Sequence, residues 1–185
     1  MGSNPTEATK FDYGDDMHDQ RIVAISGGFD PLTEGHLDLM RAAAAWKEVD
    51  GIQVYVNVER DLVKKKGFHL QSLPLRMKLC FYTMVGLIST ENRGEGAVMK
   101  SLIVVPVIDN DGSVIETLRK YRPTIFANGG DRKDESSIPE SDVCKELGIE
   151  MAFGVGSGKV GSSSNMFHQA VNEYMWPSRP TGRVV

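Results

Sequence analysis

The sequence has few of the features that mark secreted, membrane-bound or metal-binding proteins. Only two cysteines, Cys80 and Cys144, occur among its 185 residues, and their spacing is not that of metal ligands, so we expect reduced thiols. No apolar run approaches the length of a membrane span, and we find no leader with a charged start and an apolar centre. We therefore expect a cytoplasmic protein without a membrane partner.

Charge and composition set further limits. The net charge of −4 argues against a general nucleic-acid binder, because such proteins usually carry a basic face. Apolar residues make up 41% and charged residues 25%, as in ordinary globular proteins, and the length favours one domain. We expect a flexible N-terminal arm over residues 1–20, the domain over 21–176 and a mobile tail over 177–185.

Strand-like and helix-like segments alternate along this domain. Short apolar or β-branched runs predict strands at 22–26, 52–58, 102–107, 124–127 and 150–155. The patterns between them predict helices at 35–47, 74–88, 113–121, 139–147 and 163–174. Regular alternation indicates parallel strands joined by helical crossovers. The sequence therefore predicts an α/β fold, a Rossmann-like open parallel sheet of about five strands with helices on both faces.

The most informative segment follows the first predicted strand and reads Gly-Gly-Phe-Asp-Pro-Leu-Thr-Glu-Gly-His over residues 27–36. Glycines let a backbone approach a ligand closely, and the start of the next helix offers unpaired N–H groups to an anion. His36 adds a donor at that point. The alternative is that Thr33 only caps the helix and His36 only packs in its first turn. In this strand–turn–helix context we favour a phosphate-binding site.

A second glycine pair, Gly129 and Gly130, lies where the fourth predicted strand ends. Asp131 could accept a hydrogen bond from a ribose hydroxyl, and Arg132 could reach a phosphate. The alternative is an ordinary β-turn with an arginine at the surface. Because the 27–36 motif is also present, we favour the binding role.

Three consecutive serines, Ser162, Ser163 and Ser164, open the last predicted helix. Hydroxyl groups at a helix N-terminus form an anion site, to which Lys159 adds a positive charge. A serine-rich linker is the alternative. Glycines at 156, 158 and 161 also fit a dinucleotide-binding fingerprint, but they follow the last strand instead of opening the first unit, so we discount it.

Two further segments carry charge. The lysines at 64–66 precede Gly67, and such a run usually lies on a solvated face. The segment 109–113, Asp-Asn-Asp-Gly-Ser, suggests calcium but lacks a further spaced carboxylate, so we predict a turn that caps the next helix.

The 27–36 motif resembles the signature of the cytidylyltransferase-like nucleotidyltransferase superfamily, usually Gly-x-Phe-Asp-x-x-His-x-Gly-His, with Thr33 replacing the first His. The same Thr-x-Gly-His occurs in the pantetheine-phosphate adenylyltransferase branch. The glycine-pair segment resembles the heptose-phosphate adenylyltransferase domain, although Thr124 replaces an Asp. The serines resemble the second superfamily signature, with Phe167 where an Arg often stands. The resemblance spans 21–166 and is closest to the heptose-phosphate adenylyltransferase and glycerol-phosphate cytidylyltransferase group.

This resemblance implies transfer of a nucleoside monophosphate from ATP or CTP to a phosphorylated sugar or alcohol, with release of pyrophosphate. It also implies Mg²⁺ as cofactor, with no protein residue assigned to it, and a homodimer or higher homo-oligomer. Catalytic roles fall on His36, Thr33 and Lys66, with Lys65 as the alternative to Lys66 and Arg76 as a weaker candidate. The expected nucleotide contacts are Gly28, Phe29, Gly35, His36, Gly129, Gly130, Asp131, Arg132, Lys159, Ser162, Ser163 and Ser164.

Two other functions remain open. Thr33 and Phe167 depart from the superfamily pattern, which fits a catalytically degenerate nucleotide-binding protein. The misplaced glycine fingerprint fits a nicotinamide-dependent oxidoreductase, but no suitable acidic residue follows the first strand–helix unit.

Overall fold

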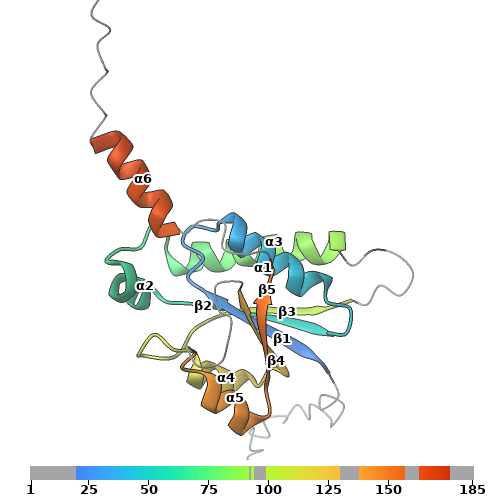
Figure 1. The fold of residues 1–185 in the computed structure, drawn as a ribbon. Coiled ribbons are helices and arrows are strands. Elements are labelled where there is room, and N and C mark those ends of the chain that lie inside the picture. Colours follow the sequence, from blue (N-terminus) through green and yellow to red (C-terminus); the bar gives the residue numbers. More distant parts are fainter. Residues whose placement is uncertain (1–19, 92, 94–98, 130–137, 157–162, 176–185) are drawn as a thin grey trace, which may run out of the picture.

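Five parallel strands form the only sheet of the part of the chain that the structure describes. The computed structural model describes residues 20–91, 93, 99–129, 138–156 and 163–175. The strands are β1 (Ile22–Gly27), β2 (Gly51–Val56), β3 (Ser101–Pro106), β4 (Ile125–Gly129) and β5 (Glu150–Val155). Their order is β3-β2-β1-β4-β5, so β1 lies in the centre between β2 and β4 (Figure 1). Residues 1–19 and the tail expected at 177–185 lie outside the described residues.

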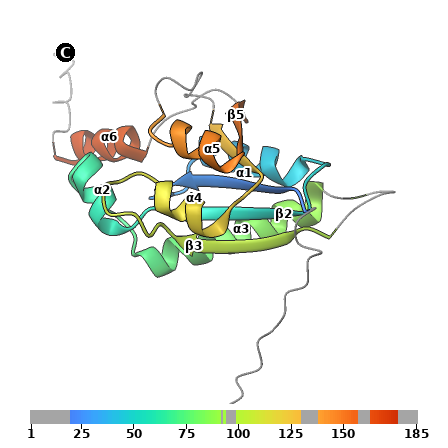
Figure 2. The ribbon, with the colours of Figure 1, turned by 90° about the horizontal axis from the view of Figure 1, so that it is seen from below.

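Helices cover both faces of the sheet. On one face lie α1 (Glu34–Ala45) and α3 (Leu73–Glu91), and on the other lie α4 (Ile115–Tyr121) and α5 (Ser141–Leu147), as Figures 1 and 2 show. The remaining two, α2 (Glu59–Lys66) and α6 (Ser163–Met175), lie next to each other at one end of the molecule in both views. None of the helices within the described ranges is long and apolar enough to cross a membrane.

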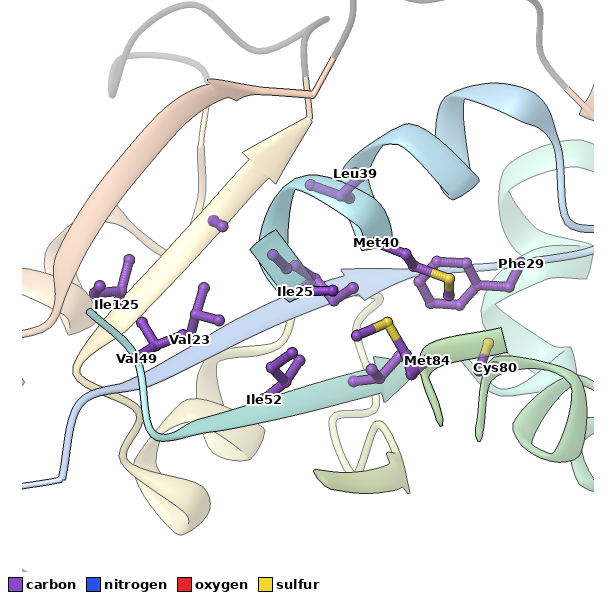
Figure 3. Packing of buried hydrophobic residues seen from close by; sticks show 14 of the residues in the cluster. Val23, Ile25, Phe29, Leu39, Met40, Val49, Ile52, Cys80, Met84 and Ile125 are labelled. Carbon is purple, nitrogen blue, oxygen red and sulfur yellow. The ribbon is translucent and has the colours of Figure 1, made fainter. Parts of the chain in front are cut away.

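The sheet is buried by apolar clusters on both faces. Figure 3 shows the first, to which Val23 and Ile25 of β1, Ile52 of β2, Met40 of α1 and Met84 of α3 belong. The second cluster, on the other face, includes Ala24, Tyr55, Leu118, Phe126 and Val143. Because side chains alternate along a strand, β1 is packed from both sides, as parallel sheets require. The segment that follows β1 therefore starts from a rigid base.

The structure confirms the predicted α/β fold, and the five expected strands all occur close to their expected ranges. It corrects two expectations about helices. The helix expected over 74–88 continues as far as Glu91. Helix α2 was not predicted at all, although Glu59 and Asp61 lie in its first turn, the three lysines in its last turn, and Gly67 ends it with a left-handed φ of 82°. This charge order complements a helix dipole.

Candidate functional site

The candidate site lies where the chain changes direction across the sheet. β1 pairs with β2 on one side and with β4 on the other, so the connections after β1 and β4 lead away in opposite directions. Ligands of open α/β sheets bind at this switch point, outside the carboxyl ends of the strands. The 27–36 motif follows β1, and Gly129 is the last residue of β4. The structure therefore brings the first motif beside the start of the second glycine pair, while Gly130, Asp131 and Arg132 lie outside the described residues.

Thr33 and His36 form one unit at the start of α1. The backbone N–H of Thr33 donates to Nδ1 of His36 at 3.1 Å, and the Thr33 hydroxyl oxygen lies 3.0 Å from the same nitrogen. An imidazole nitrogen that accepts an N–H bond carries no proton, so this contact assigns the ring proton of the neutral form to Nε2. The structure thus presents His36 as a donor through Nε2, as an oxyanion requires, while Thr33 is 7% exposed and directed at the ring.

Phe29 supports the imidazole from the side. Its ring meets that of His36 edge-to-face with centroids 5.1 Å apart, and the phenylalanine is only 1% exposed. Its backbone φ of 48° lies in the left-handed region, which a bulky residue rarely adopts. Strained backbone of this kind clusters at functional sites. This conformation accompanies the edge-to-face contact between Phe29 and His36.

Asp30 connects the motif to the segment that follows α2. Its side chain is fully buried, and its carboxylate accepts hydrogen bonds from the backbone N–H groups of Leu70, at 2.8 and 3.1 Å, and of Gln71, at 2.7 Å. Bonds from N–H groups to a carboxylate are charge-assisted and stronger than neutral ones. The carboxylate of Asp30 therefore fixes the 27–36 motif against the segment after α2. This role was not predicted from the sequence.

Of the three lysines, the structure brings Lys66 to the motif. Its Nζ donates to the backbone oxygen of Asp30 at 2.9 Å and lies 3.5 Å from Oδ2 of the same residue. Lys65 is exposed, and Lys64 donates to the backbone oxygen of Asp111 at 3.3 Å. An ammonium group has three donors, so the two contacts with Asp30 leave one for a phosphate.

Arg76 joins the ends of two strands instead of facing a ligand. It is fully buried, and its Nη1 donates to the backbone oxygens of Gly28, at 2.8 Å, and Asn57, at 2.6 Å, while Nε donates to the oxygen of Gln71 at 3.0 Å. Burial lowers the pKa of Arg76, and the Glu59 carboxylate, 3.9 Å from Nη2, opposes that effect. For Glu59, burial raises the pKa, but the N–H of Leu73 and the charge of Arg76 outweigh it and the pKa is lowered.

The glycines of the motif are not all explained by a ligand. A Cβ on Gly28 would lie 2.7 Å from the Leu62 side chain of α2, whereas a Cβ on Gly35 would meet nothing within 4 Å. Gly156, with a φ of 87°, packs so tightly on α1 that a Cβ would lie 3.0 Å from the backbone of Asp38 and Leu39. Close packing on α1 therefore accounts for the first glycine of the apparent dinucleotide fingerprint, whereas Gly158 and Gly161 lie outside the described residues.

The structure describes part of the serine segment and the whole of the 109–113 segment. Helix α6 begins at Ser163, whereas Lys159 and Ser162 lie outside the described residues. In the 109–113 segment, Asp109 accepts hydrogen bonds from the N–H groups of Glu116, at 2.7 Å, and Thr117, at 3.1 Å. This confirms the expected cap of the next helix.

No family model matches the chain, but two curated proteins do. The chain is 27% identical to the bifunctional protein HldE of Gluconobacter oxydans over 131 residues, which cover 71% of this chain and 24% of that protein. It is 32% identical to a phosphopantetheine adenylyltransferase of Mesorhizobium japonicum over 114 residues, 60% of this chain and 56% of that protein. The chain thus spans less than two thirds of the length of either relative.

A solved structure shows the same fold. The lipopolysaccharide core biosynthesis protein from Thermoplasma volcanium GSS1 matches with a TM-score of 0.50 and 20% identity, over 75% of this chain and 98% of that chain. Fold and topology define a Rossmann-like α/β protein with its candidate site at the switch point. Within that class, the sequence relatives show that the chain is related to the cytidylyltransferase-like nucleotidyltransferases, which confirms the resemblance predicted from the motifs.

Proposed function

We propose that the protein transfers a nucleoside monophosphate from ATP or CTP to a small phosphorylated acceptor and releases pyrophosphate. The observation that carries this proposal is the arrangement after β1. There the Nε2 proton of His36 and the N-terminus of α1, joined by the bond from the Thr33 N–H to Nδ1, lie in the same 27–36 motif whose Asp30 backbone oxygen accepts from the Lys66 ammonium group. These are three sources of positive potential beside a rigid strand, as a polyphosphate requires.

The acceptor needs no strong base, because a phosphate oxygen is already a nucleophile at neutral pH. That oxygen forms a bond to the α-phosphorus of the triphosphate, and the bond from this phosphorus to the β-phosphate oxygen breaks, so pyrophosphate leaves with the electron pair. The protein aligns the two groups and stabilises the charge that develops on the oxygens. We assign His36 Nε2 and Lys66 Nζ as donors to these oxygens, and the Thr33 hydroxyl as the donor of a third hydrogen bond.

The rest of the nucleotide extends along the carboxyl ends of β1, β4 and β5. Gly28, Phe29 and Gly35 would contact it from the first motif and Gly129 to Arg132 from the second, while Lys159 and Ser162 to Ser164 would hold the β- and γ-phosphates. Among the described residues, no three histidine, cysteine or carboxylate side chains gather as metal ligands. The resemblance implies Mg²⁺, which would enter with the triphosphate, bound mainly by phosphate oxygens and water.

The names of the relatives narrow the substrates. One relative is called an adenylyltransferase that acts on phosphopantetheine, which favours ATP and an acceptor with a terminal phosphate. We expect the same reaction type here. We also expect a cytoplasmic homodimer or higher homo-oligomer, and light scattering would measure its mass.

A catalytically degenerate nucleotide-binding protein is the second candidate. It is favoured by the Thr33 hydroxyl, which lies 3.0 Å from His36 Nδ1 and is thus engaged inside the protein. A screen of pyrophosphate release, with four nucleoside triphosphates against a panel of phosphorylated metabolites, separates the two candidates. Release that requires both a triphosphate and an acceptor supports the enzyme. Triphosphate binding without release from any pair supports the degenerate protein.

A further inference from the structure

An aromatic contact joins α6 to the segment that carries Lys66. Phe68 follows α2, and Phe167 lies in the second turn of α6. Their ring centroids are 4.2 Å apart with the planes inclined by 35°, and both rings are half-buried. Both views show α6 beside α2 (Figures 1 and 2). The contact thus bridges α6 and the segment after α2, which are distant in sequence.

The Phe68 ring also contacts the side chain of Lys66. The Lys66 ammonium group lies 5.5 Å from the centroid of the Phe68 ring, within the range of a cation–π interaction. Lys66 is therefore held from two directions, by the oxygens of Asp30 and by the face of Phe68. Such double support restricts the rotamers of a side chain that is otherwise flexible.

Phe167 is the main described anchor of α6. The side chains of Met166, His168 and Ala170 are exposed, whereas Phe167 and Val171, one turn apart, are half-buried. Residues four apart lie on the same face of a helix, so this face is the one that α6 turns to the protein. Ser163, the first residue of α6, precedes Phe167 by one turn.

We propose that Phe68 and Phe167 form a positioning pair that sets the N-terminus of α6 and the Lys66 ammonium group in one fixed arrangement. This inference rests on the proposed function and deepens it. Phe167 stands where the resembling signature often has an arginine, and its ring cannot contact a phosphate through a charge. The Phe167 ring instead packs on Phe68, and Phe68 in turn holds the Lys66 ammonium group. Both phenylalanines are therefore positioning residues and not catalytic ones.

The pair predicts a division of kinetic effects. Phe68→Leu removes both the ring face under Lys66 and the ring contact with Phe167, so kcat should fall roughly two- to thirtyfold and KM for the triphosphate should rise as well. Phe167→Leu leaves that face intact but loosens α6, so it should raise KM for the triphosphate more than it lowers kcat. Phe68→Tyr keeps an aromatic face and should retain the turnover. Phe81→Leu, at a 43% exposed ring on α3, is the matched control and should change neither constant.

Hydrogen exchange tests the contact without relying on turnover. Amides of 165–171 should exchange faster in Phe68→Leu and Phe167→Leu than in the wild type, and at the wild-type rate in Phe81→Leu. Unchanged exchange in α6, or equal kinetics for Phe68→Leu and wild type, overturns the positioning pair while leaving the proposed function intact. A wild type that neither binds triphosphate nor releases pyrophosphate overturns both.

Discussion

Replacing Asp30 with asparagine tests whether a buried charge holds the motif and the segment after α2 together. The Asp30 carboxylate accepts from the N–H groups of Leu70 and Gln71, and the Lys66 ammonium group lies 3.5 Å from Oδ2. Asparagine has nearly the same shape, but its amide nitrogen donates and would face another donor. The Lys66 side chain is only 12% exposed, so its charge would lose its partner in a largely buried place.

The size of the effect follows from these contacts. Removing one partner of a buried ion pair costs about 3–5 kcal/mol. We expect the lower end, about 3 kcal/mol, because Lys66 still donates to the backbone oxygen of Asp30 at 2.9 Å. In a domain of this size, that loss corresponds to a fall in Tm of roughly 6–12 °C. Thermal and urea denaturation of the wild type and of Asp30→Asn measure both quantities.

A double-mutant cycle isolates the cause. If the unpaired charge of Lys66 dominates, Asp30→Asn should cost less in a Lys66→Met background than in the wild type, by at least about 1 kcal/mol. The reasoning is refuted if the two substitutions are additive, or if Asp30→Asn alone costs less than about 1 kcal/mol. In that case the backbone contacts alone hold the two segments.

Three other substitutions test the assigned roles. His36→Ala should lower pyrophosphate release by on the order of a hundred- to a thousandfold. The same change should lower Tm much less, because it removes only the contact with the Thr33 N–H and the packing on Phe29 of a half-exposed ring; wild-type turnover in this variant would contradict the assignment. Thr33→Ala should lower turnover by roughly ten- to a thousandfold with a smaller effect on nucleotide affinity, and unchanged turnover would reduce Thr33 to a helix cap. Replacing Ser163 and Ser164 with alanine should weaken triphosphate binding, measured by calorimetry, and spare monophosphate binding. Equal losses for the two ligands would mean that the serines are structural or hold another part of the nucleotide.

The fold could be predicted because its strands are near-continuous apolar runs. Residues 22–27 and 51–56 are buried by helices on both faces, and such strands show their burial directly in sequence. Helix α2 escaped prediction because it is short and largely charged, and Leu62 is its one buried apolar side chain. The sequence features that could have predicted α2 are its acidic first turn, its basic last turn and Gly67 after its last residue.

Part of the candidate site could also be predicted. The position of the 27–36 motif follows from strand–turn–helix order alone, and the structure places it at the switch point as expected. Asp30 and Arg76 had no predictable roles, because their partners are set by tertiary packing: Leu70 is 40 residues from Asp30, and Gly28 is 48 residues from Arg76. The resemblance already favoured Lys66 over Lys65, and the structure places Lys66 beside Asp30.

The Arg76 guanidinium group has a consequence for how the site fluctuates. It bonds the backbone oxygens of Gly28, Asn57 and Gln71, which belong to three separate connections. None of these connections can open alone without leaving a buried charged donor unsatisfied, which costs more than a neutral bond. The three should therefore open as one cooperative unit, with a shared opening free energy in native-state hydrogen exchange. The backbone that a ligand would contact after β1 is therefore held in place before binding by Arg76, a fully buried side chain.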